Sequence, residues 1–282
     1  MAHCIVPEAD AVLDREFPVL DKGFVRLVDY LGGDERVVQS ARVSYGTGTK
    51  SYREDAGLID YLLRNRHTSP FEQVILTFHI KLPIFTARQW VRHRTARINE
   101  ISGRYSVMKD DFYIPDPADI ALQSADNKQG RSAEALEETL AEQVRAAFAA
   151  GQERAYGDYK RLIEGGIARE LARINLPLSL YTEWFWQIDL HNLFHFLELR
   201  LDAHAQREIR LYAAVLLELA KKVAPRCCES FERHILRGVS FSGEEFAELK
   251  RRLAGGAETI PPSLKGKALE RFEEKLRTGG QG

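Results

Sequence analysis

The sequence predicts an α+β subunit that is mostly helical and contains a small, largely antiparallel sheet. Apolar residues recur at the spacing of a helix face over several long stretches, most clearly from residue 205 to residue 223. Three shorter segments are rich in β-branched and aromatic residues, which is typical of strands. Strands and helices do not alternate as regular βαβ units, and no glycine-rich phosphate loop follows a strand. Neither a Rossmann site nor a P-loop site is therefore expected.

Three strands are expected in this chain. Residues 23–31 place apolar residues among polar neighbours and end at Gly32-Gly33. Residues 74–82 form an apolar, β-branched run that stops at Pro83, and residues 180–188 are aromatic and alternate in polarity. These segments would build the small sheet.

Helices account for much of the remaining chain. A long helix is expected to begin at Ser132 as its N-cap, after a surface loop over residues 114–131, and to end at Gly165-Gly166. The segment from Ser69 to Glu72 matches a capping box with proline at the first helical position, which predicts another helix start. Further helices are expected at residues 34–41, 55–66, 84–94, 192–201 and 205–223, and in two charged stretches beyond residue 241.

Composition and charge exclude several classes of protein. The chain has 282 residues, with 40 Lys and Arg against 41 Asp and Glu, so its formal net charge is −1. Such a near-neutral chain is a poor candidate for a general nucleic-acid coat or a membrane-surface binder. It contains no apolar run of about 18 residues and no basic, apolar signal peptide at its start. Its three cysteines, Cys4, Cys227 and Cys228, suit no disulfide framework and favour the cytoplasm.

The most unusual segment lies between residues 88 and 104. It contains five arginines, Arg88, Arg92, Arg94, Arg97 and Arg104. If its first part is helical, arginines lie on two faces, with Arg88, Gln89, Arg92 and His93 on one and Trp90, Arg94 and Arg97 on the other. Glu100 is the only carboxylate in the segment, so pairing within it cannot neutralise these cations. Because arginine grips phosphate with two parallel hydrogen bonds, the segment predicts an anion site.

The same segment resembles the signature of a known enzyme family. Arg92-His93-Arg94 is followed after seven residues by Ser102, as in the flavin-dependent thymidylate synthases. The resemblance runs from about residue 20 to about residue 235. It includes Asn99-Glu100 and Gly103-Arg104-Tyr105, and beyond the motif it is carried by Ala41 to Ser44, His67 to Glu72, Phe85 to Trp90, Phe112 to Pro115, Ala172-Arg173, Leu176-Pro177 and Leu199 to Gln206.

The resemblance implies the fold, assembly and ligands of that family. The family has an α+β subunit that forms a homotetramer, with four active sites at subunit junctions. Its members bind FAD and use dUMP, methylenetetrahydrofolate and NADPH to make dTMP and tetrahydrofolate. The resemblance further implies a division of the chain into an arm over residues 1–20, the synthase domain over residues 21–240, and a peripheral helical extension over residues 241–282.

Carried over position by position, the resemblance also implies the site residues. Arg200 would lie by the uracil ring as the activating residue. Contacts to FAD are implied for Ser69, Arg92, His93, Arg94, Glu100, Asp189, Leu190, His191 and His195. Contacts to dUMP are implied for Gln89, Trp90, Val91, Arg92, Glu100, Ile101, Ser102, Gly103, Arg104, Arg173 and Arg200.

The residues favour an electrophilic mechanism on independent grounds. Methylating C5 of uracil requires that this carbon become nucleophilic, and a cysteine adding at C6 is one way to achieve this. No cysteine of this chain lies in a basic, aromatic-lined motif. A fixed guanidinium such as Arg200 can instead stabilise the ring anion without a covalent bond to protein. Ser102 is read as a hydrogen-bonding group, because a nucleophilic serine needs an adjacent base and the nearest histidine in sequence, His93, is nine residues away.

Two other functions are compatible with single features of the sequence. A non-enzymatic RNA- or DNA-binding module could use the arginines of residues 88–104, but it would need a wider basic field than a chain of net charge −1 provides. A metal hydrolase could use His191 and His195, four positions apart, together with His204. A zinc site needs three or four converging ligands, and no HExxH motif is present, so no metal is expected.

Overall fold

The computed structural model describes residues 4–43, 52–125, 130–132, 134, 136–253 and 264–278. Its centre is a five-stranded sheet of order β1-β2-β3-β5-β4 in which every neighbouring pair is antiparallel. The predicted α+β class with a small antiparallel sheet is confirmed. The strands are β1 (Glu16–Val19), β2 (Gly23–Leu31), β3 (Ile75–Pro83), β4 (Arg97–Glu100) and β5 (Tyr181–Asp189).

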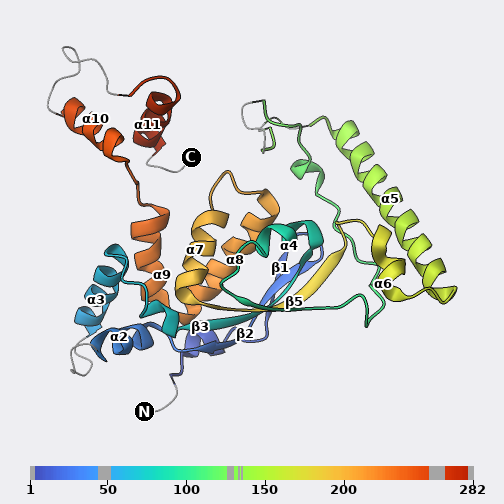
Figure 1. Cartoon of the computed structure of the whole chain (residues 1–282), viewed down its shortest axis with the longest axis horizontal. Helices are drawn as coiled ribbons and strands as arrows, with labels where there is room; N and C mark the ends of the chain where they lie inside the picture. Colours follow the sequence, from blue (N-terminus) through green and yellow to red (C-terminus); the bar gives the residue numbers. More distant parts are fainter. Residues whose placement is uncertain are drawn as a thin grey trace.

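Alternating side chains give the sheet one buried and one half-exposed face. On β3, Leu76, Phe78 and Ile80 are completely buried, while Thr77 and His79 between them are half-buried. Three helices cover the buried face (Figure 1). These are α4 (Ile84–Trp90), α7 (Leu190–Arg200) and α8 (Arg207–Val223). The main hydrophobic core therefore lies between this helical layer and the sheet.

A second group of helices packs beside the sheet. It consists of α2 (Asp34–Val43), α3 (Tyr52–Arg64) and α9 (Pro225–Phe231). The N-terminal segment joins the same core, because α1 (Pro7–Asp10) packs on α8 and Ala9, Val12 and Val19 are buried. Two helices, α10 (Gly243–Leu253) and α11 (Lys267–Thr278), lie in the two charged stretches expected beyond residue 241, and they extend away from the sheet (Figure 1).

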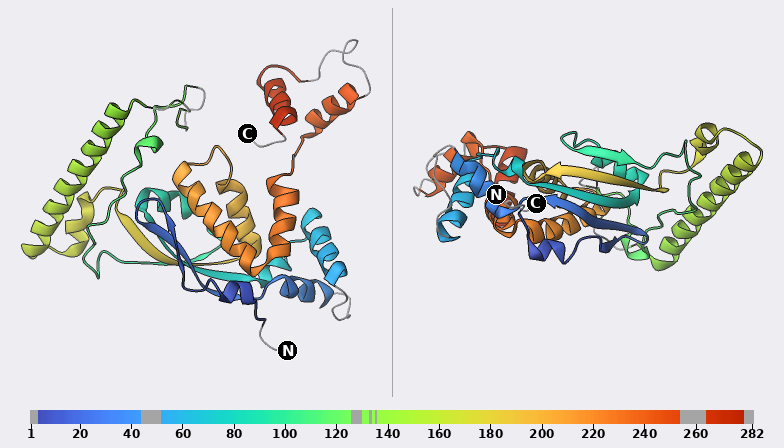
Figure 2. Two further views of the ribbon diagram at one scale, coloured as in Figure 1. Left: turned by 180° about the vertical axis from the view of Figure 1, so that it is seen from behind. Right: turned by 90° about the horizontal axis from the view of Figure 1, so that it is seen from below.

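The long helix α5 (Glu138–Glu164) and the short α6 (Arg169–Ala172) lie at the opposite end of the molecule (Figure 2). A small separate core beneath them contains Met108, Phe112, Tyr159, Ala172 and Leu180. The apolar stripe expected on this helix is only partly covered. Leu140, Phe148 and Leu162 are 42%, 48% and 40% exposed.

Two predicted helix starts are wrong. The long helix begins at Glu138 rather than after Ser132, whose hydroxyl instead accepts a hydrogen bond from the backbone of Glu134 at 3.1 Å in a local turn. The segment after Ser69 forms only a 3₁₀ turn, η1 (Phe71–Gln73), without a capping side chain. Strand β3 begins two residues later, so no room remains for an α-helix.

The predicted helical continuation through the arginine segment is also wrong. Helix α4 ends at Trp90, a 3₁₀-like turn follows, and Arg97–Glu100 becomes the edge strand β4. Pairing of β4 with β5, in which Arg97 lies opposite Gln187, draws the chain away from the helix axis. Arg94 and Arg97 therefore do not share a helix face with Trp90.

Candidate active site

Arg200 lies at the C-terminal end of α7 and meets the arginine-rich segment. Its Nε donates a hydrogen bond to Nε2 of His93 at 2.9 Å, across 107 positions of sequence. The His93 ring also contacts His195 and Phe196, with ring centroids 6.0 and 4.8 Å apart. The fold thus brings the residue expected to activate the nucleotide next to two residues expected on the cofactor side.

Burial lowers the pKa of both His93 and Arg200. Burial, followed by the charges of Arg200 and His195, lowers the pKa of His93 to about 4, so this imidazole is neutral at pH 7. A neutral ring can accept the Nε–H of Arg200, as the geometry requires. Burial also lowers the pKa of Arg200, yet a guanidinium remains protonated at any working pH. The terminal nitrogens of Arg200 bond to no residue that the structure describes, which leaves them for a ligand.

Gln89, expected on the nucleotide side, is joined to the first turn of α8. Its Nε2 donates to Oε1 of Gln206, and Nε2 of Gln206 donates to Glu208 at 2.8 Å. Reasoning from the sequence did not single out Gln206 or Glu208 as site residues. The only available signal was that Gln206 ends the last matching segment of the family.

The arginine segment remains largely unneutralised. Arg88, Arg92 and Arg94 are exposed, and within the described part of the chain they form no ion pair. Arg97 differs, because it donates to the side chain of Gln187 at 3.2 Å. Three adjacent cations without counter-ions are the electrostatic signature of a site for an anionic ligand.

A second group of expected nucleotide residues surrounds the turn after β4. The hydroxyl of Ser102 accepts a hydrogen bond from the backbone N–H of Arg104 at 3.3 Å. Gly103 lies against Met108 and Arg173: a Cβ at this position would come within 2.9 Å of the Met108 sulfur and 3.1 Å of the Arg173 side chain, so a larger residue would require these side chains to shift. Four residues expected to contact dUMP therefore lie close together: Ser102, Gly103 and Arg104 in the turn, and Arg173 beside it.

The remaining members of this group are held by the sheet and by α6. The Glu100 carboxylate accepts a hydrogen bond from the Thr182 hydroxyl at 2.5 Å, and Arg104 pairs with Glu170 at 3.1 Å. Ile101 is exposed, and its backbone N–H donates to the carbonyl of Glu183 at 2.9 Å. Within the described ranges, no side-chain hydrogen bond, ion pair or ring contact links this group to Arg200, His93 or Gln89.

Two of the nine expected flavin residues lie around a cavity of about 400 Å³ beside α7. His191 and His195 line it, together with Arg66, Thr68 and Asn192, which sequence reasoning missed. Thr68 directly precedes Ser69, an exposed residue that was expected to contact FAD. This adjacency was the only signal in the sequence that could have pointed to Thr68. The cavity offers a guanidinium, two imidazoles, an amide and a hydroxyl, together with the carboxylate of Glu198.

Several expected ligand residues have structural roles. The Asp189 carboxylate caps α7 by accepting from the backbone N–H of Asn192 at 2.9 Å and from its side-chain amide at 2.7 Å. The side chains of Leu190 and Trp90 are completely buried, so any ligand contact by these two residues is made through the backbone. Val91 is half-buried against the main core.

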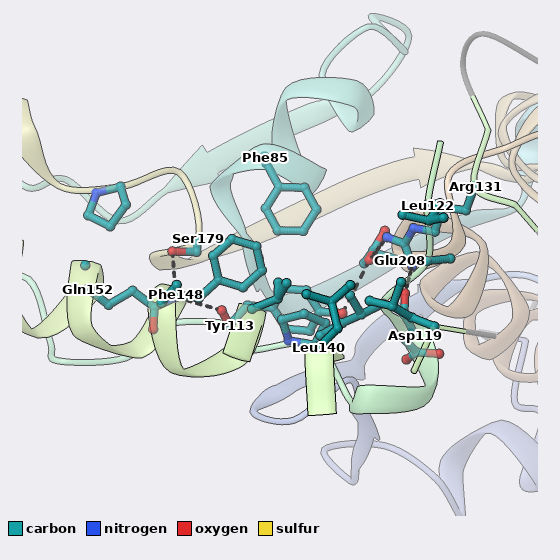
Figure 3. Close-up of a pocket in the computed structure, with 18 of the residues that line it drawn as sticks. Phe85, Tyr113, Asp119, Leu122, Arg131, Leu140, Phe148, Gln152, Ser179 and Glu208 are labelled. Carbon is teal, nitrogen blue, oxygen red and sulfur yellow. Dashed lines mark hydrogen bonds and ion pairs between the residues drawn. The ribbon is translucent and has the colours of Figure 1, made fainter. Parts of the chain in front are cut away.

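A larger cavity, of about 880 Å³, lies elsewhere (Figure 3). It separates α5 from the body of the subunit, and apolar side chains such as Leu140 and Phe148 line much of it. Glu208 and Arg131 close one end. None of the expected site residues lines this cavity.

Within the described ranges, no group of three His, Cys, Asp or Glu side chains is placed to hold a metal ion, and no helix there is long and apolar enough to cross a membrane. The thiols of Cys227 and Cys228 are completely buried at the start of α9. Burial, and then the nearby Asp34, raise the pKa of both thiols well above the usual value. Neither cysteine can therefore supply a thiolate at neutral pH.

A cysteine-free variant is expected to remain active. The triple substitution Cys4→Ser, Cys227→Ala and Cys228→Ala should keep the activity that the resemblance implies, dTMP formation, within roughly tenfold of the parent, or about 1.4 kcal/mol of barrier. The measurement is a steady-state assay on protein whose fold has been checked by circular dichroism. Complete loss of activity in a folded variant would instead support a thiol mechanism.

Comparison with known proteins identifies the family. The model of the family described as thymidylate synthase complementing protein matches residues 26–226, and the model described as thymidylate synthase ThyX C-terminal domain matches residues 239–282. The flavin-dependent thymidylate synthase of Treponema denticola is 64% identical over 269 residues, covering 95% of this chain and 100% of that protein. This chain belongs to the flavin-dependent thymidylate synthases. The family resemblance expected from the sequence is confirmed.

Other members and solved structures agree with this membership. The flavin-dependent thymidylate synthase of Treponema pallidum is 62% identical and covers 100% of this chain and 91% of that protein. A crystal structure of the UMP/dUMP methylase PolB from Streptomyces cacaoi, bound with 5-Br dUMP, is 34% identical. It covers 78% of this chain and 98% of that chain, with a TM-score of 0.69. The chain is therefore an enzyme of a flavin-dependent methylating family.

Proposed function

We propose that this enzyme converts dUMP to dTMP, with methylenetetrahydrofolate as the carbon donor and NADPH as the source of reducing equivalents through FAD. Support comes from curated relatives, 64% and 62% identical, that carry the name flavin-dependent thymidylate synthase, and from the UMP/dUMP methylase bound with 5-Br dUMP. The unpaired cysteines are compatible with action in the cytoplasm.

The hydrogen bond between Arg200 and His93 is the observation that carries the proposed mechanism. In this mechanism, the Arg200 guanidinium lies at the edge of the uracil ring and stabilises the negative charge that develops there as C5 becomes nucleophilic. Neutral His93 fixes Arg200 by accepting its Nε–H, and this orients the terminal nitrogens towards the substrate. Half-burial strengthens the interaction, because fewer water molecules screen the charge.

The residues of the cavity beside α7 fit a flavin dinucleotide. Its diphosphate requires cations and hydrogen-bond donors, and the segment around Arg92 and Arg94 supplies guanidinium groups that have no protein counter-ion within the described residues. The cavity itself adds Arg66, His191 and His195, alongside the carboxylate of Glu198. When bound, FAD supplies the hydride that completes the methyl group. In this assignment it is held by Ser69, Arg92, His93, Arg94, Glu100, His191 and His195, with Asp189 and Leu190 contributing through the backbone.

The nucleotide site is proposed to be shared between copies of this chain. Arg200 and Gln89 lie on the helical layer, whereas Ser102, Arg104 and Arg173 gather around the turn after β4. A second copy can bring the two groups together across a symmetric interface. The remaining dUMP contacts in this assignment are backbone contacts of Trp90 and Val91, and contacts of Arg92, Glu100, Ile101 and Gly103.

A homotetramer is expected in solution. The half-exposed apolar stripe of α5, which includes Leu140 and Phe148, needs a partner surface. Light scattering on the purified protein should give four times the 32.1 kDa mass of one chain. A monomer at working concentration would contradict both the tetramer and the shared site.

The decisive test of the proposed function is an anaerobic assay. Purified enzyme supplemented with FAD is mixed with dUMP, methylenetetrahydrofolate and NADPH, and dTMP is measured by chromatography. The expected result is a yellow protein that forms dTMP only when all three substrates are present. Absence of product with flavin bound would contradict the proposal.

A further inference from the structure

A buried carboxylate, Glu208, lies in the first turn of α8 and is connected to the expected nucleotide site. It is 1% exposed and closes one end of the large cavity (Figure 3). Oε1 of Glu208 pairs with the Arg131 guanidinium and accepts a hydrogen bond from the Tyr113 hydroxyl at 3.3 Å. Oε2 accepts from Nε2 of Gln206 at 2.8 Å. Each carboxylate oxygen is therefore engaged by a donor.

Glu208 is ionised at neutral pH. Burial alone would raise the pKa of this carboxyl group, but the hydrogen bond and charge of Arg131, with a smaller contribution from Gln206, lower it below the usual value. Its position in the first turn of α8 also favours negative charge. An ionised carboxylate can only accept hydrogen bonds.

Because the Glu208 carboxylate can only accept hydrogen bonds, it fixes the orientation of the side-chain amide of Gln206 and, through it, that of Gln89. Gln206 must direct its Nε2 towards Glu208, which leaves its Oε1 facing Gln89. Gln89 must then direct its own Nε2 towards Gln206. The Oε1 of Gln89 accepts no hydrogen bond from any residue in the described ranges, so an acceptor is what Gln89 presents to a ligand.

We propose that Glu208 is a positioning residue that acts through Gln206 to fix Gln89 with its carbonyl oxygen towards the bound nucleotide. This inference rests on the proposed function, because it takes dUMP as the ligand. The chemistry is selective. At neutral pH, dUMP carries only two hydrogen-bond donors outside its phosphate, the ring N3–H and the sugar 3′-hydroxyl, and one of these pairs with the Gln89 oxygen.

The hydrogen bonds that run from Glu208 through Gln206 to Gln89 form a relay, and the variant that tests it is Glu208→Gln. Arg131 retains the remaining oxygen of the new side chain, so its NH₂ group faces Gln206 and the Gln206 amide must turn. Gln89 then turns as well and presents its NH₂ group to the nucleotide. Calorimetric titration of the holoenzyme should show dUMP binding weakened about tenfold, the loss of one hydrogen bond in a buried site. Flavin content should stay at the parental level.

Glu248→Gln is the matched control. Glu248 is also a completely buried glutamate that pairs with arginines, but it lies on α10, outside the expected site. Its substitution should leave dUMP binding unchanged. An equal loss of dUMP affinity in both variants would show that removing any buried carboxylate has this effect, and would overturn the proposal.

A double-mutant cycle distinguishes a relay from general loosening of the fold. In a Gln89→Ala background, Glu208→Gln should have no further effect on dUMP affinity, because the group being oriented is absent. Gln206→Met, which breaks the relay without altering Glu208, should reproduce the tenfold loss and keeps the proposal testable if Glu208→Gln fails to fold. Additive effects in the cycle, or Gln206→Met binding dUMP like the parent, would overturn it.

Two analogues of dUMP identify which of its donors, N3–H or the 3′-hydroxyl, bonds to the Gln89 oxygen. Binding of 3-methyl-dUMP, which lacks N3–H, and of 2′,3′-dideoxyuridine monophosphate, which lacks the 3′-hydroxyl, is compared between the parent and Glu208→Gln. One analogue should bind equally to both proteins, and that analogue identifies the partner of Gln89. If both analogues keep the tenfold difference, the relay does not act on a nucleotide donor. Failure of the parent enzyme to bind dUMP would instead count against the proposed function itself.

Discussion

Replacing Arg200 with lysine is expected to lower turnover by about 10² to 10³ while FAD remains bound. A lysine keeps the positive charge but loses the planar fork, so the two-point contact that the terminal nitrogens make with the uracil edge, while Nε is held by His93, is lost. Losing one preorganised donor at a developing negative charge typically has an effect of this size. Flavin should be retained, because the cavity beside α7 is lined by His191 and His195 and not by Arg200.

The experiment compares two lysine variants. Arg200→Lys and Arg210→Lys are purified, their flavin content is measured from absorbance, and methylation is followed at saturating dUMP. Arg210 is a half-buried arginine on α8 that donates to the carbonyl of Ala203 at 2.8 Å, outside the expected site. It should tolerate lysine with near-parental turnover. Parental turnover in Arg200→Lys with flavin bound would mean that Arg200 is not the activating residue.

The sequence predicts those strands in which the strand's own pattern of apolar and polar side chains determines which face is buried. Strands β2, β3 and β5 were expected within a residue or so, since their alternating apolar positions face the helical layer. Strand β4 carries no such pattern, because all four of its residues are exposed. Only pairing with β5 makes it a strand, and that pairing joins segments far apart in sequence.

Local capping signals were less reliable than periodicity. Ser132 has the chemistry of an N-cap, yet its hydroxyl is used in a turn six residues before α5 begins. Ser69 and Glu72 have the spacing of a capping box, but strand β3 begins too soon for a helix to form. In both places tertiary structure overrides a motif worth only about 1 kcal/mol.

The family motif supplied the expected site residues but not Gln206 and Glu208, which we propose position one of them. The resemblance implied that Arg200 contacts dUMP and that His93 contacts FAD, but it did not imply the hydrogen bond that joins these two residues. Gln206 and Glu208 were missed, since a glutamine and a glutamate at a helix start look like ordinary surface residues. The role we propose for them depends on partners 117 and 77 positions away in sequence, which no local pattern reveals.

The second large expected effect is a loss of folding stability when Trp90 is replaced. This side chain is completely buried at the end of α4, and its ring lies 4.7 Å from Phe196, 5.2 Å from Trp186 and 5.7 Å from Trp184, measured between centroids. These rings join α4 to α7 and to β5. The side chain that anchors this junction therefore also holds its neighbour, Gln89, in place.

Trp90→Ala is expected to destabilise the enzyme by about 3–5 kcal/mol, the usual effect of emptying a large aromatic site in a core. Thermal unfolding followed by circular dichroism should shift down by about 2–4 °C for each kcal/mol. Trp90→Phe should be milder, because Nε1 of Trp90 has no hydrogen-bond partner among the described residues and phenylalanine keeps much of the ring contact. An unchanged unfolding temperature in Trp90→Ala would contradict this packing. At 25 °C the folded alanine variant should also bind dUMP more weakly, since Gln89 loses its support while Arg200 keeps its bond to His93.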